Sequence, residues 1–214
     1  MSRLESLKAL VMEQAAAKKF GTTPGDINVG EKLFLVGSEV KEIYDALGHH
    51  RGTFDEMATF GEEYAILKND PQTLWEKGQH GLDVAIAVTT ARNHYREEWA
   101  DLLSRVVHLG GIFGITFADR YSIIPNGAPP IETVPPPWDS VRFLTLYNWI
   151  QDIGAHYRKK RIPEFEAHIP YLAAYILESG RREEFDVYHL ALVKLEKNRT
   201  RVWDANTLNE RFAK

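Results

Sequence analysis

The chain has 214 residues, enough for one domain or two small ones with a sizeable core. Hydrophobic residues make up 44% and charged residues 26%, which is ordinary for a soluble globular protein. A net charge of −4 gives no electrostatic reason to expect a nucleic acid or an anionic membrane as partner. The absence of cysteine excludes disulfides, thiolate metal ligands and cysteine nucleophiles.

The N-terminal stretch MSRLESLKALVMEQ carries charges throughout and lacks the apolar run of a signal peptide. The longest apolar run, VVHLGGIFGITFA, is too short to cross a bilayer, which needs about 20 residues. Together with the lack of cysteine, these features predict a soluble protein of the reducing cytoplasm.

Helical periodicity covers most of the chain. Leu4, Leu7, Leu10 and Val11 predict a helix over 3–19, and the stretch TTPGDINVG that follows has the composition of a loop. Further helices are predicted over 31–47 with Gly48 as its stop, then over 53–69, 72–95, 96–113, 140–160, 162–179 and 184–200. No alternating strand pattern persists, so the predicted fold class is all-α, a helical bundle.

The segment IIPNGAPPIETVPPPW holds two proline clusters, which exclude regular structure. We interpret the chain as a single all-α domain over 1–214, with halves 1–123 and 140–214 joined by the proline-rich loop 124–139. FLVGSEVKEIYDALGHHR before this loop is echoed by FLTLYNWIQDIGAHYR after it, which predicts a degenerate second helical hairpin without the acids of the first. The alternative is that short amphipathic helices resemble each other by chance.

Two acidic pairs accompany apolar helix faces. Glu39 and Glu42 lie three residues apart on one flank of a stripe formed by Val36, Val40, Ile43, Tyr44 and Leu47. Glu98 and Asp101 have the same relation to a face formed by Trp99, Leu102, Leu103, Val106 and Val107. If the two helices pack together, the four acids converge at one end of the shared core. Four carboxylates need compensating positive charge, and oxygen-only ligands suit Mg²⁺ or Mn²⁺. The alternative is that these are surface acids of ordinary amphipathic helices.

A basic motif, VKLEKNRTR, stands near the C-terminus. Lys194 and Asn198 are four residues apart on one helix face, with Arg199 and Arg201 just beyond. Lysine and arginine donors suit phosphate oxygens, and an asparagine can bind a base or a sugar. The alternative is a solvated basic helix end, which the helix dipole favours.

GEKLFLVGSEVKEIYDAL, EEWADLLSRVVHLGGIFGI and KLEKNRTR together resemble the three successive motifs of the MazG-like family. Members are all-α nucleoside triphosphate pyrophosphohydrolases, related to dimeric dUTPases and phosphoribosyl-ATP pyrophosphohydrolases. The resemblance covers about a third of the chain. The chain departs from the family in the 55 residues between Glu42 and Glu98, and in the segment from the proline-rich loop to Glu184. The family usually has short connections at both places.

The resemblance implies hydrolysis of a nucleoside triphosphate between the α- and β-phosphates, which gives a nucleoside monophosphate and diphosphate. Glu39, Glu42, Glu98 and Asp101 are then the metal ligands and catalytic acids, with Glu39 the first choice for general base. The substrate-binding residues are then Lys194, Asn198, Arg199 and Arg201. Pairing of subunits in the family implies a homodimer. The alternative is that 140–179 imitates the partner's hairpin within one chain.

Other function classes lack support in the sequence. The eight histidines form no HExxH pattern and no ExxH pair of the di-iron type. There is neither GxxxxGK[ST] nor GxGxxG, and REEWAD lacks the rest of a Nudix motif. The competing hypothesis is a non-catalytic helical interaction module with a vestigial nucleotide site.

Overall fold

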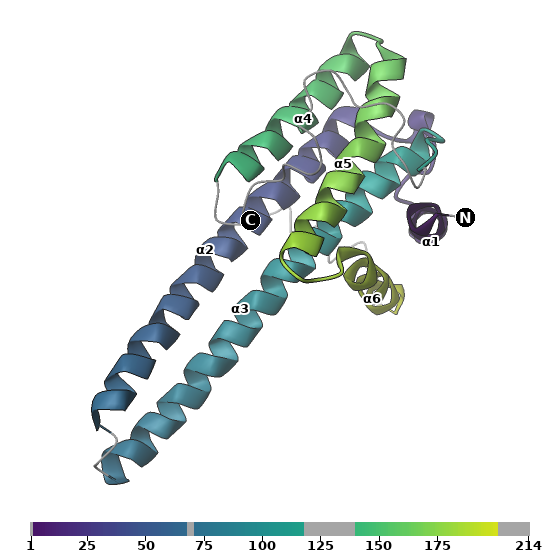
Figure 1. Ribbon diagram of the computed structural model, residues 1–214. Helices are drawn as coiled ribbons and strands as arrows, with labels where there is room; N and C mark the ends of the chain where they lie inside the picture. Colours follow the sequence, from purple (N-terminus) through teal and green to yellow (C-terminus); the bar gives the residue numbers. More distant parts are fainter. Residues whose placement is uncertain (1, 68–70, 118–139, 201–214) are drawn as a thin grey trace, which may run out of the picture.

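The computed structural model describes residues 2–67, 71–117 and 140–200 (Figure 1). These form α1 (Arg3–Ala17), α2 (Val29–Leu67), α3 (Pro71–Ile112), α4 (Ser140–Arg158), α5 (Ile162–Arg182) and α6 (Val187–Arg199), with a 3-10 turn at Pro24–Asp26. No strand occurs in the described ranges, and the predicted all-α fold class is confirmed. The proline-rich loop 124–139 lies outside the described residues.

Helices α2 and α3 are longer than the sequence analysis predicted. They have 39 and 42 residues, roughly 60 Å each at 1.5 Å per residue. The predicted stop at Gly48 is wrong, and so is the boundary between 95 and 96. A glycine inside a helix costs only about 1 kcal/mol relative to alanine. Packing of α2 against α3 outweighs that cost, and the described residues between Glu42 and Glu98 lengthen both helices.

The α4–α5 hairpin completes a four-helix arrangement within the chain. Helix α4 packs against α2, and α5 packs against both α3 and α4. Figure 1 shows this hairpin alongside the first half of α2 and the second half of α3. The remaining halves of α2 and α3 extend beyond it as two long helices. The core of the bundle therefore lies at one end of the α2–α3 pair.

The predicted apolar faces are buried, with two exceptions. The five residues of the α3 face are each at most 1% exposed, and the α2 stripe is buried at Val36, Val40, Ile43 and Leu47. Tyr44, predicted in that stripe, is 54% exposed and meets Phe143 edge-on with ring centroids 5.3 Å apart. Leu10 of α1 is also exposed. Both side chains lie at the margin of their stripe, where a helix face meets solvent.

Helices α1 and α6 pack against α3 and against each other. The Ser2 hydroxyl caps α1 by accepting from the Glu5 amide, and the Asp186 carboxylate caps α6 by accepting from the His189 amide. Gln14 Nε2 of α1 donates to the Leu195 carbonyl of α6 over 2.6 Å. These contacts fix α6 beside α3. In the described part of the chain, no helix has both the length and the apolar character needed to span a membrane.

Candidate functional site

A polar stripe runs along α3 on the side that α1 and α6 cover. It consists of residues spaced alternately four and three apart: His94, Glu98, Asp101, Arg105 and His108. This spacing keeps the side chains on one helix face. At 100° per residue, the centre of this stripe lies well over 90° around the helix axis from the centre of the apolar face that includes Trp99. One side of α3 therefore packs in the core, and another side carries polar groups.

Three of the four predicted acids meet at this stripe. One carboxylate oxygen each from Glu39, Glu98 and Asp101 lies within 4.8 Å of the other two. Glu39 reaches the group from α2, and it is 2% exposed, while Glu98 is 6% exposed and Asp101 is half-buried. The two acidic helices therefore contribute to one cluster, which we call the acidic triad.

Glu42 does not belong to the acidic triad. It lies one turn beyond Glu39 on α2, is exposed, and lines the mouth of the same pocket. Its charge still contributes to the raised pKa of both Glu39 and Glu98. Four acids were predicted to converge. Three of them do, and the fourth, Glu42, lines the same pocket. Within the described residues, the Glu42 carboxylate has no hydrogen-bond partner from the protein.

Each acid of the triad has one oxygen bound by a basic group. Arg105 Nε donates to Glu39 Oε1, and Lys194 Nζ donates to Asp101 Oδ2. His94 Nδ1 lies 3.2 Å from Glu98 Oε1. The three basic residues surround the triad and fix the orientation of its carboxylates, as the residues behind metal ligands do.

The second oxygens of the two buried glutamates are left without partners. Glu39 Oε2 and Glu98 Oε2 are fully buried, and neither has a hydrogen-bond partner in the described structure. A buried polar atom without a partner costs free energy, and native proteins rarely leave one unsatisfied unless water or an ion completes the site. These oxygens belong to two members of the triad, whose three carboxylates together offer an oxygen-only ligand set that suits Mg²⁺ or Mn²⁺.

Ionisation of the two buried glutamates of the triad is unfavourable, and their pKa values are raised. Burial raises the pKa of Glu39 to about 7, against the opposing charge of Arg105, and Asp101 and Glu42 add to the rise. Burial likewise raises the pKa of Glu98 to about 7, although Lys194 opposes it. A divalent cation would favour the ionised forms and lower both pKa values.

The triad lies in a pocket of about 500 Å³ between α1, α2, α3 and α6, a size typical of small-molecule sites. Basic side chains line the pocket around the acids: Lys18, Arg105, Lys194 and Lys197. Asn198 also lines it, and its side-chain oxygen is buried without a partner. The pocket therefore combines a carboxylate cluster with four cationic side chains and an asparagine whose side-chain oxygen has no partner.

Only part of the C-terminal motif VKLEKNRTR lines the pocket. Lys194 and Asn198 line the pocket, as the i, i+4 spacing predicted. Arg199 is exposed, pairs with Glu196 at 3.7 Å, and does not line it. Arg201 lies outside the described residues. Helix α6, predicted beside both acidic helices, packs against α3, α1 and α5, and it faces α2 across the pocket.

Two residues that contact the triad were not predicted as site residues from the sequence. Arg105 is four residues after Asp101, and His94 is four residues before Glu98, so helical spacing places both beside the acids. That spacing was a usable signal. Lys18 gave none, because its place in the pocket depends on how α1 packs against α6.

Comparisons of the chain with protein-family models, with curated proteins and with solved structures find no match. The residues of the pocket are therefore the basis for assigning a function.

Proposed function

We propose that the chain is a divalent-metal-dependent hydrolase that cleaves nucleoside triphosphates between the α- and β-phosphates. One observation carries the proposal. Glu39 Oε2 and Glu98 Oε2 are buried without partners in a pocket that cationic side chains also line. A purely structural bundle gains nothing from two unsatisfied carboxylate oxygens at such a place.

The acidic triad fits the metal that this reaction needs. Glu39, Glu98 and Asp101 would hold Mg²⁺ or Mn²⁺ through carboxylate oxygens, a ligand set suited to hard divalent cations. When bound, such an ion screens phosphate charge and lowers the pKa of a coordinated water. In the metal-free structure, His94, Arg105 and Lys194 each lie against one of the three carboxylates.

The basic side chains suit the substrate's phosphates. Lys194 and Lys197 on α6 and Lys18 on α1 line the pocket around the acids. They would bind the phosphate oxygens and offset the negative charge that develops on the departing diphosphate. Asn198 would bind the base or the sugar through its unpaired side-chain oxygen. Arg199 and Arg201 have this role only through the resemblance to the MazG-like family.

The general base is better sought at Glu42 than at Glu39. Glu39 is buried, binds Arg105 through Oε1 and contributes one oxygen to the triad, so it is less accessible to an attacking water than the exposed Glu42. Glu42 lies outside the triad on the pocket wall. It could take a proton from the water whose oxygen attacks the α-phosphorus, as the bond to the bridging oxygen of diphosphate breaks.

The test is release of diphosphate from a panel of ribo- and deoxynucleoside triphosphates, with Mg²⁺ and with a chelator. We expect metal-dependent release from at least one of them, and its loss in Glu98→Gln and Glu42→Gln. Asp45→Asn is the matched control, because Asp45 is an exposed acid of α2 that pairs with Lys41. If no nucleotide is cleaved and no Mn²⁺ binds, the proposal fails in favour of the helical interaction module.

A further inference from the structure

Arg105 joins the two acidic helices at the centre of the site. It lies on α3 one turn after Asp101, and its Nε donates to Glu39 Oε1 of α2. The Glu39 side chain is 3% exposed, whereas that of Arg105 is 41% exposed and lines the pocket. The pair thus has a fixed buried end and an exposed cationic end.

Most of the donors of Arg105 are unused. A guanidinium carries five N–H donors in a planar fork. Only Nε has a hydrogen-bond partner among the described residues, so the two terminal nitrogens remain available at the pocket wall. Such a fork matches two oxygens of a phosphate group.

The charges around the acidic triad change when a divalent cation enters. Before entry, Arg105 and Lys194 offset two of the three negative charges that the ionised triad carries. A cation bound to Glu39 and Asp101 takes over that role and repels both basic side chains. An incoming polyphosphate then brings new negative charge, for which the displaced side chains are the nearest donors.

We propose that Arg105 exchanges partners during binding: it neutralises Glu39 in the metal-free protein, and it turns to the substrate's phosphate oxygens once a divalent cation holds Glu39. This inference rests on the proposed metal-dependent function and adds a phosphate-binding residue to it. Arg105 is better suited to the exchange than Lys194, whose side chain is 18% exposed and carries no fork.

A purely structural role for Arg105 makes different predictions. If the residue only ties α2 to α3, its removal should loosen Glu39 and weaken the binding of metal and of phosphate together. If Arg105 competes with the metal for Glu39, its removal should strengthen metal binding and weaken phosphate binding. The two effects then have opposite signs.

The experiment compares Arg105→Met with wild type and with Arg92→Met, an exposed arginine of α3 outside the pocket. Mn²⁺ alone is titrated first, followed by inorganic tripolyphosphate in saturating Mg²⁺, which avoids any dependence on the base. For Arg105→Met we expect Mn²⁺ to bind several-fold more tightly. Tripolyphosphate should bind roughly ten- to a hundredfold more weakly, as for a lost hydrogen bond from a charged donor. Arg92→Met should match wild type in both.

Arg105→Lys provides a second test that keeps the charge and removes the fork. Arg105→Lys should bind Mn²⁺ like wild type and tripolyphosphate several-fold more weakly. This test remains possible even if Arg105→Met does not fold. Weaker Mn²⁺ binding in Arg105→Met, or unchanged tripolyphosphate binding in both variants, would overturn the inference while the metal site stands. If wild type itself binds no Mn²⁺, the proposed function fails instead.

Discussion

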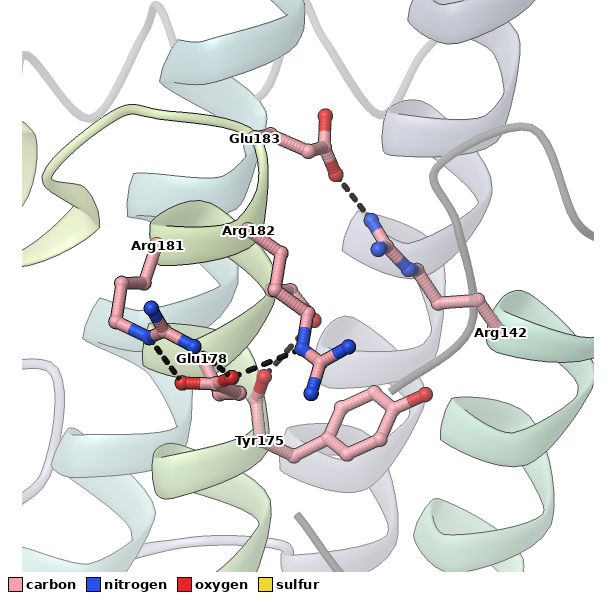
Figure 2. Close-up of polar contacts among 7 residues, drawn as sticks. Arg142, Tyr175, Glu178, Arg181, Arg182 and Glu183 are labelled. Atoms are coloured by element: carbon pink, nitrogen blue, oxygen red, sulfur yellow. Dashed lines mark hydrogen bonds and ion pairs between the residues drawn. The ribbon is translucent and has the colours of Figure 1, made fainter. Parts of the chain in front are cut away.

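Among the described residues, two clusters of buried charge differ in how completely their carboxylates are paired. Glu183 at the end of α5 accepts from Arg142 of α4 and from the Tyr95 hydroxyl of α3, which lies 3.0 Å from Oε1 and 2.8 Å from Oε2 (Figure 2 shows the pair with Arg142). Both carboxylate oxygens are therefore satisfied. In the acidic triad, Glu39 and Glu98 each keep one buried oxygen without a partner.

This difference separates a structural charge cluster from a candidate binding site. Both clusters are desolvated, and burial raises the pKa of Glu183 as it raises the pKa of Glu39 and Glu98. A raised pKa therefore does not by itself identify the site. The unsatisfied oxygens and the pocket around the triad mark the candidate site, because they leave acceptors and space for a ligand, whereas both oxygens of Glu183 already have donors.

The largest effect should come from breaking the closed cluster. Arg142 is fully buried, so Arg142→Met leaves the Glu183 carboxylate without its cation in the interior. We expect the free energy of unfolding to fall by about 3–5 kcal/mol, measured by urea denaturation. Mn²⁺ binding by the variant that remains folded should be unchanged.

The control for Arg142 lies in the same region of the molecule. Arg181 pairs with Glu178 at 2.7 Å, but its side chain is 72% exposed (Figure 2). Arg181→Met should cost less than about 1 kcal/mol, as for other exposed pairs. Equal losses in the two variants would show that the Arg142 cluster is no more important for stability than a surface pair.

The acidic triad should make the metal-free protein less stable as the pH rises. Glu39 and Glu98 have a pKa of about 7 in the folded chain and about 4.5 when unfolded. Between these values the folded state holds more protons, so the free energy of unfolding decreases from pH 5 to pH 8. The decrease should be roughly 1–2 kcal/mol for each group, since solvent and neighbouring charges reduce the full effect of the shift.

Denaturation at several pH values, with and without Mg²⁺, measures this effect. Saturating Mg²⁺ should reduce or reverse the decrease, because the ion favours the ionised carboxylates. A variant carrying both Glu39→Gln and Glu98→Gln should show a flatter profile. A profile that is the same in wild type and in this variant would contradict the raised pKa values.

The next effect concerns the phosphate-binding side of the pocket. Lys194 bonds Asp101 and is 18% exposed, so it is neither a core residue nor a freely solvated lysine. If it binds substrate phosphates, Lys194→Ala should lower kcat/KM by roughly ten- to a hundredfold at saturating Mg²⁺. Lys41→Ala is a suitable control, since Lys41 is an exposed lysine paired with Asp45. A loss under about threefold for Lys194→Ala would show that Lys194 does not bind the substrate's phosphates and only pairs with Asp101.

Much of the fold could be predicted from the sequence because apolar residues repeat at helical spacing. The α3 face and most of the α2 stripe are buried as predicted. The helix ends were harder, because Gly48 carries a stop signal that packing between α2 and α3 overrides.

The candidate site could be predicted only in part. At 100° per residue, Glu39 lies roughly 85° from the centre of the α2 stripe and Glu42 roughly 145°. That rotation explains why Glu39 is buried and Glu42 exposed, and it was available from the sequence. The position of Lys18 and the pairing of Arg105 with Glu39 were not, because they depend on how the helices pack.

The smallest effect should come from changing the state of assembly. The resemblance to the MazG-like family predicts a homodimer, with the alternative that 140–179 takes the partner's place. In the described structure the α4–α5 hairpin packs against α2 and α3 of its own chain, which is the arrangement that internal pairing requires. We therefore expect Mn²⁺ affinity and turnover per chain to be unchanged on dilution, with the mass followed by light scattering. A fully active monomer would replace the predicted homodimer with internal pairing. Activity that falls with the dimer fraction would show that a second copy contributes to the site.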